Sequence, residues 1–129
     1  MTRAKRMTLI GVGGAAGGLA RALAVVVLPV ALLPGAALLA VNLSGSLLAG
    51  TLRGLAERDQ QEGRDRSELD ALMIVGFCGG FTSYSGFIAV AGGEAAWIAV
   101  ATLVGCPVAA LAGMWLSGGY PARPAGNAR

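Results

Sequence analysis

Residues 76–87 combine backbone and side-chain groups that are suited to handling an ion. They read Gly-Phe-Cys-Gly-Gly-Phe-Thr-Ser-Tyr-Ser-Gly-Phe, within a stretch that carries no charge from residue 71 to residue 93. Two adjacent glycines weaken a helix, and lipid tolerates a broken helix only where the break is packed in protein or lines a polar cavity. Broken helices near the membrane midplane commonly build ion sites from carbonyls and helix ends. The segment therefore predicts part of an ion pathway.

A second polar group, the amide of Asn42, lies in another uncharged stretch and is followed by Ser44, Gly45 and Ser46. An amide at membrane depth must find polar partners, so it faces protein or a water-filled path. Its two N–H donors suit an anion. The alternative is an interhelical hydrogen bond worth about 0.6–2 kcal/mol, and both interpretations stay open.

Three further side chains have more than one possible use. Arg21 ends the first apolar stretch; it is a candidate for attracting anions to a pore vestibule, for pairing with helix-end carbonyls, or for reaching a lipid phosphate. Tyr84 and Phe87 are three residues apart and share one helical face. Because the edge of an aromatic ring is positive, they suit the lining of an anion route, with simple packing as the alternative.

Four apolar segments position these groups. The chain has 129 residues, is 55% hydrophobic and contains 21 glycines. A membrane-spanning helix needs about 20 mostly apolar residues, which predicts spans at 7–28, 36–56, 69–91 and 95–117. Small residues let such helices approach closely. We therefore expect an all-α integral membrane protein, with a four-helix unit over residues 1–120, a third helix broken near the midplane and a disordered tail at 121–129.

The distribution of charge predicts orientation and argues against nucleic acid as a partner. Three basic residues precede the first span, four lie around the connection between the second and third spans, two lie in the tail, and Arg21 is within a span. With four spans these three segments share one side, and the positive-inside rule places both termini in the cytoplasm. The expected location is the plasma membrane, with lipid as the surroundings.

The side chains provide no basis for an enzyme. The chain has no His, and its spans contain no cluster of carboxylates. Cys78 and Cys106 fall within spans and lack further ligands for a metal, so we interpret them as packing residues. A small four-helix multidrug exporter is disfavoured because the first span lacks an acidic residue.

Together these elements resemble the Fluc (CrcB) family of fluoride channels over nearly the whole chain. The matching stretches are Gly-Gly-Leu-Ala-Arg at 17–21, Val-Asn-Leu-Ser-Gly-Ser-Leu-Leu-Ala-Gly at 41–50 and the segment 76–87. The last is the most specific, since the family pattern runs close to Gly-Phe-Cys-Gly-Gly-x-Thr-Thr-Phe-Ser-Thr-Phe. The resemblance implies passive fluoride export through antiparallel dimers with two narrow pores and a central structural sodium ion.

Roles for particular residues follow from the resemblance. Gly79 and Thr82 would offer backbone carbonyls to the sodium ion. Asn42 would donate to fluoride, while Tyr84 and Phe87 take the two pore-lining Phe positions. Ser85 would belong to the polar track, and Thr102 would supply a pore hydroxyl from the fourth span.

The chain also departs from the family pattern. Gly86 stands where Thr is usual, and Ile98 takes the place of a pore tyrosine, so each deletes a hydroxyl from the pathway. One-sided basic residues conflict with a homodimer of inverted copies, which requires one sequence to insert both ways. We therefore consider a homodimer and a heterodimer with an inverted paralogous subunit. The alternative function is a non-conducting partner that assembles with and orients a conducting paralogue.

Overall fold

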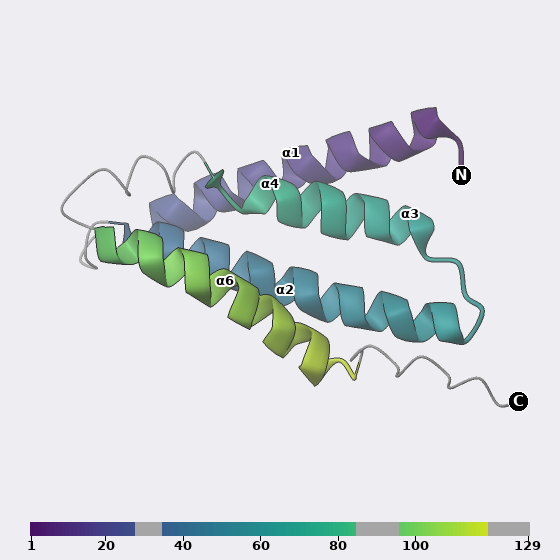
Figure 1. Ribbon diagram of the computed structural model, residues 1–129. Coiled ribbons are helices and arrows are strands. Elements are labelled where there is room, and N and C mark those ends of the chain that lie inside the picture. Colours follow the sequence, from purple (N-terminus) through teal and green to yellow (C-terminus); the bar gives the residue numbers. More distant parts are fainter. Residues whose placement is uncertain (28–34, 85–95, 119–129) are drawn as a thin grey trace, which may run out of the picture.

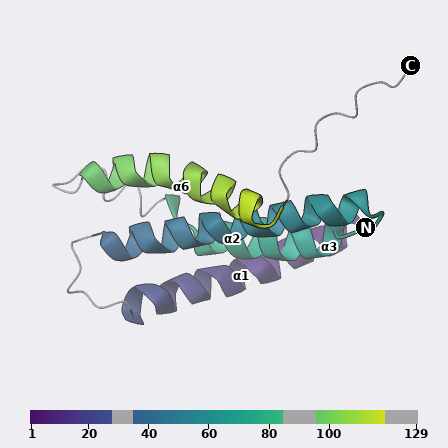
Figure 2. The ribbon, with the colours of Figure 1, turned by 90° about the horizontal axis from the view of Figure 1, so that it is seen from below.

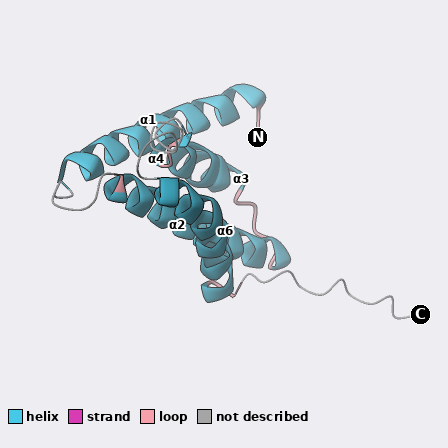
Figure 3. Cartoon of the chain, turned by 60° about the vertical axis from the view of Figure 1, so that its left-hand side comes forward, coloured by secondary structure: helices cyan, strands magenta, loops and turns pink. Residues whose placement is uncertain are grey.

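A computed structural model describes residues 1–27, 35–84 and 96–118, and every regular element in these ranges is helical (Figures 1 and 3). The long helices are α1 (Arg3–Val27), α2 (Ala36–Gln61) and α6 (Ala96–Leu116). Between α2 and α6 a helical run comprises α3 (Ser67–Leu69), the π-helical η1 (Asp70–Cys78) and α4 (Gly79–Phe81). These elements match four predicted spans in position, although the stretch from residue 85 to residue 95 lies outside the described residues.

The three long helices are each long and apolar enough to cross a membrane. Many of their large apolar side chains are exposed, as expected of surfaces that meet lipid or another subunit; on α6 these are Trp97, Val100, Leu103, Val104, Val108, Leu111, Trp115 and Leu116. α2 continues five residues past the predicted end of its span. An i,i+4 ion pair between Arg53 and Glu57, at 3.1 Å, lies in that polar last part.

The helices associate as two pairs. α6 packs along α2, and α1 packs along η1 and α4, while η1 also contacts α2 (Figures 1 and 2). The start of α1, the end of α2 and the start of α3 lie at the same end of the molecule (Figure 1). The clustered basic residues of these segments therefore share one end.

Glycines set the spacing between α1 and the third helical run. A Cβ on Gly13 would overlap the Leu72 carbonyl oxygen, and a Cβ on Gly17 would overlap that of Phe77. From the opposite side, a Cβ on Gly80 would overlap the Gly14 carbonyl. Close backbone approach through small residues is how membrane helices gain packing contacts that lipid cannot replace.

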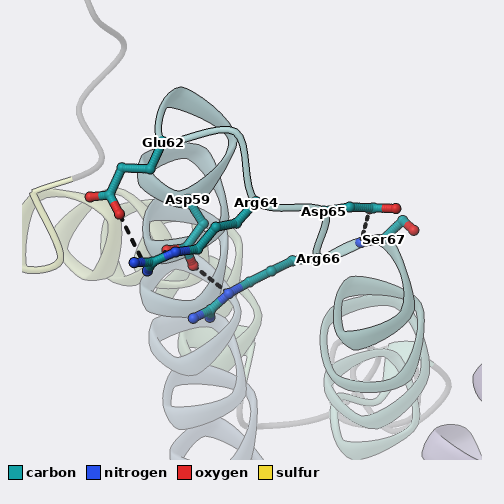
Figure 4. A network of polar contacts seen from close by, with 6 residues as sticks. All are labelled: Asp59, Glu62, Arg64, Asp65, Arg66 and Ser67. Atoms are coloured by element: carbon teal, nitrogen blue, oxygen red, sulfur yellow. Dashed lines mark hydrogen bonds and ion pairs between the residues drawn. The ribbon is translucent and has the colours of Figure 1, made fainter.

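The connection between α2 and α3 is held by ion pairs around Asp59, which is only 7% exposed (Figure 4). Arg64 lies 3.2 Å from Asp59, and Arg66 pairs with its other carboxylate oxygen. The Ser67 backbone N–H donates to Asp65 Oδ1 at 2.9 Å, and this hydrogen bond lowers the pKa of Asp65. The two ion pairs hold the connection against the end of α2.

Candidate ion site at the end of the third helical run

The third helical run ends within the segment that the sequence singles out. α4 ends at Phe81, and Thr82 is extended, with φ −75° and ψ 155°. The Cys78 carbonyl accepts hydrogen bonds from the Thr82 backbone N–H and hydroxyl, both at 3.0 Å. The last carbonyls of a helix lack intrahelical donors, so this end presents acceptors at membrane depth. The second half of the predicted broken helix falls mostly on residues 85–91, outside the described residues.

Asn42 is 4% exposed, and it pairs with the backbone of Ser83. The Ser83 N–H donates to Asn42 Oδ1 at 2.8 Å, and Asn42 Nδ2 donates to the Ser83 carbonyl at 3.4 Å. In a continuing α-helix that N–H would donate to the Gly79 carbonyl. Asn42 Oδ1 therefore takes the place of the carbonyl that would accept this N–H in a continuing helix. The hydrogen bond holds the helix end against α2.

Gly45 makes this pairing sterically feasible. A Cβ at position 45 would lie 2.7 Å from Thr82 Cγ2 and 3.0 Å from Phe81 Cδ1, both closer than ordinary packing allows. With hydrogen in place of Cβ, α2 approaches the end of α4 closely. The approach brings Asn42, one turn earlier on α2, within reach of Ser83.

Arg21 reaches the same helix end from α1. Its Nη1 donates to the Thr82 carbonyl at 3.2 Å, which is one of the three uses that the sequence left open. A guanidinium at a helix C-terminus also complements the negative end of the helix dipole. Two helices, α1 and α2, thus contribute polar side chains to one short break.

A cavity of about 340 Å³ lies beside the break, between α2 and α6. Its lining comprises Asn42, Ser46, Thr82, Ser83, Tyr84, Thr102, Leu103, Cys106 and Pro107. The sequence predicted Asn42, Tyr84 and Thr102 as pore residues, and the structure brings them to this one cavity. Tyr84 is 76% exposed at its rim. The other two predicted pore residues, Ser85 and Phe87, lie outside the described residues.

A second hollow, of about 240 Å³, contains the two residues predicted to offer carbonyls to a cation. Gly79 and Thr82 line it together with Gly45, Ser46, Ala49, Ile74, Cys78 and Ala110. The Gly79 carbonyl is released from its i+4 helical donor, and the Thr82 carbonyl keeps a lone pair beside the bond from Arg21. Carbonyl oxygens are hard ligands, so these two carbonyls are the groups of this hollow that could serve as ligands of a small cation.

Sequence reasoning did not assign Ser46 or Cys106 to the cavity. Ser46 follows Asn42 by one helical turn, and this i,i+4 spacing was the signal that could have found it. Ile98, which replaces a family tyrosine, is 2% exposed and does not line the cavity. Its carbonyl instead accepts the Thr102 hydroxyl at 2.8 Å.

The described residues form helices, three of them long and apolar enough to cross a membrane, with a cavity at a helix end; this is the architecture of a helical membrane protein. The protein-family model described as CrcB-like protein, Camphor Resistance (CrcB), matches residues 8–117. The chain therefore belongs to the CrcB family, which is the Fluc family of fluoride channels. It is a multi-pass membrane protein, and its family comprises channels rather than enzymes. Searches among curated proteins and among solved structures gave no match.

Proposed function

We propose that this chain is a subunit of a fluoride-selective channel that mediates passive export of cytoplasmic fluoride. Hydrogen fluoride enters an acidified cell as a neutral molecule and dissociates inside, and a channel lets the trapped anion leave down its gradient. The observation that carries the proposal is the Asn42 amide beside the helix break, in a cavity that no Lys or Arg of the described residues lines. An anion that has lost its water needs hydrogen-bond donors around it, whereas a fixed positively charged side chain would bind the anion too tightly for release.

An antiparallel dimer is the assembly that we propose, in the plasma membrane and with both termini of this chain in the cytoplasm. The one-sided basic residues favour a single orientation. The inverted neighbour is therefore a paralogous subunit rather than a second copy. In such a pair each pore has its own set of side chains, so the missing hydroxyl at Gly86 in one pore leaves the other intact.

A structural sodium ion belongs to the same proposal. In an antiparallel dimer the hollow that contains Gly79 and Thr82 would face its counterpart, and the backbone carbonyls of both subunits would share one ion. Within the described residues no group of three His, Cys, Asp or Glu side chains could hold a metal, so the carbonyls are the natural ligands. Sodium bound there would be structural and would take no part in fluoride movement.

Fluoride efflux from liposomes tests the channel, with chloride efflux as the control. We reconstitute the chain alone and, separately, after co-expression with an inverted paralogue. Fluoride-selective efflux only from the co-expressed protein supports the heterodimer. Robust efflux from the chain alone supports a channel but overturns the single-orientation argument, and no efflux from either preparation overturns the channel.

A second candidate is a non-conducting subunit that assembles with and orients a conducting paralogue. The burial of Ile98 favours it, because no side-chain donor from that position reaches the cavity. Gly86→Thr returns one family hydroxyl. If the heterodimer with this variant conducts faster than the wild type, a degenerate pore is present; unchanged flux favours a purely structural subunit.

A further inference from the structure

We propose that Asn42 and Ser46 form a paired hydrogen-bond donor site on α2 that binds a small dehydrated anion. The assignment of Ser46 rests on the proposed channel function, and it adds a residue that neither the family resemblance nor the pore prediction included. Ser46 follows Asn42 by four residues, so both side chains project from one face of α2. Both line the cavity beside the helix break.

Two of the hydroxyl protons around the cavity are engaged. The Thr82 hydroxyl donates to the Cys78 carbonyl, and the Thr102 hydroxyl donates to the Ile98 carbonyl. Ser or Thr inside a helix often donates to the carbonyl four residues earlier in this way. Ser46 makes no hydrogen bond to any of the described residues. Its proton is therefore available to an occupant of the cavity.

The second donor is fixed in orientation by Ser83. Because the Ser83 N–H must meet an acceptor, Asn42 presents Oδ1 to it, and this assigns the other atom of the amide as the NH₂ group. One N–H of that group makes the long 3.4 Å bond to the Ser83 carbonyl. The other N–H is left for a ligand, one helical turn from the free hydroxyl of Ser46.

The pair suits transient binding of a small anion. Two neutral donors replace part of a hydration shell, and the lining formed by the described residues contains no Lys, Arg or carboxylate that would trap or repel the ion. Conduction requires binding that is strong enough for entry and weak enough for release. Ser46 also lines the hollow that contains Gly79 and Thr82, so it stands between the candidate anion and cation positions.

Ser46→Ala tests the site, with Ser44→Ala as the matched control on the same helix. The Ser44 side chain lies on the exposed face of α2 and donates to the Val41 carbonyl. We measure fluoride efflux and its dependence on fluoride concentration in the preparation that conducts. Loss of one hydrogen bond to an ion predicts about a tenfold or larger fall in fluoride flux for Ser46→Ala. The same rate as wild type is expected for Ser44→Ala.

Ser46→Thr separates donation from packing because it keeps the hydroxyl and adds a methyl group. Flux close to wild type in this variant, with slow flux in Ser46→Ala, supports the donor pair. Slow flux in both variants, or wild-type flux in Ser46→Ala, overturns the assignment while leaving the channel in place. No fluoride flux from any wild-type preparation refutes the channel itself, and the anion site is refuted with it.

Discussion

At the scale of single residues, the proposed anion site gives Asn42 two roles that one amide can fill. Its oxygen accepts from the Ser83 N–H and so shapes the helix end, while its nitrogen keeps a donor for the cavity. The two roles use different atoms of the side chain. Substitutions that remove one atom at a time therefore separate the stability of the break from the recognition of an anion.

Asn42→Asp and Asn42→Ala make that separation. At a site that is 4% exposed the aspartate is expected to take up a proton. The neutral acid keeps both bonds to Ser83 but has no second N–H for the anion, so we expect stability near that of wild type and little fluoride flux. Alanine leaves the Ser83 N–H and carbonyl without their partner, at a cost of about 1–3 kcal/mol. Unfolding in mixed detergent and liposome efflux measure the two effects. Equal loss of stability in both variants would contradict the assigned bond.

Asp65 offers a prediction about pH. The Ser67 backbone N–H, and after it the Ser67 side chain, lower the pKa of this carboxyl below its ordinary value of 3.8. A lowered folded-state pKa means that the contribution to stability is present above about pH 4 and is lost as the pH falls through the folded pKa. NMR titration should place the midpoint below 3.8. In Asp65→Asn the acid-dependent change at the start of α3 should disappear, and a midpoint at or above that of an unstructured peptide would contradict the hydrogen bond.

At the scale of elements, Gly17 connects helix packing to the site. Arg21, which reaches the Thr82 carbonyl, lies one turn after Gly17 on α1. Gly17→Ala places a methyl group into the Phe77 carbonyl and 2.8 Å from the Phe81 nitrogen. Backbone cannot move aside as a side chain does, so α1 must shift, at a cost of about 1–3 kcal/mol.

Gly11→Ala is the matched control because nothing lies within 4 Å of the added Cβ. We expect its stability to stay within about 0.5 kcal/mol of wild type. Unfolding free energies of both variants in detergent check the difference. If Gly17→Ala proves as stable as Gly11→Ala, α1 does not approach η1 and α4 as closely as described.

The elements were largely predictable from the sequence, whereas the contacts between them were not. Uncharged runs predict α1, α2 and α6 because a span is a local property of about 20 residues. The two glycines at 79 and 80 point to a weakness close to where α4 ends. The partner of Asn42 lies 41 residues away and that of Arg21 61 residues away. Such pairings depend on how helices pack, so sequence alone left several uses open for each side chain.

The ion pairs around Asp59 could not be predicted from the sequence either. Six acidic and four basic residues between 53 and 70 suggest a solvated connection. The structure instead buries Asp59 at the end of α2 and brings Arg64 and Arg66 to it (Figure 4). A buried carboxylate needs partners placed by the backbone, and the course of a short connection is not encoded in its composition.

At the scale of the whole molecule, the one-sided distribution of basic residues favours one orientation in the membrane, and this orientation decides which neighbour the chain can pair with. The start of α1, the end of α2 and the start of α3 gather at one end (Figure 1), and these segments together with the connection between α2 and α3 hold seven of the ten basic residues. Basic residues close to the ends of spans set orientation, whereas acidic residues contribute little. The acidic residues of the same connection should therefore leave the bias intact. An antiparallel neighbour must then have the opposite bias.

We expect a reporter fused at the C-terminus to be cytoplasmic in essentially all molecules. Arg3 and Arg6 make no ion pair with the described residues. A variant in which both are neutralised and two lysines are added between residues 28 and 34 should produce molecules of both orientations. Glu62→Gln serves as the control, because an acidic residue has little influence on insertion. A wild-type chain already found in both orientations would contradict the bias and permit a homodimer. A fixed orientation, by contrast, makes an inverted paralogue necessary for any antiparallel channel that contains this chain.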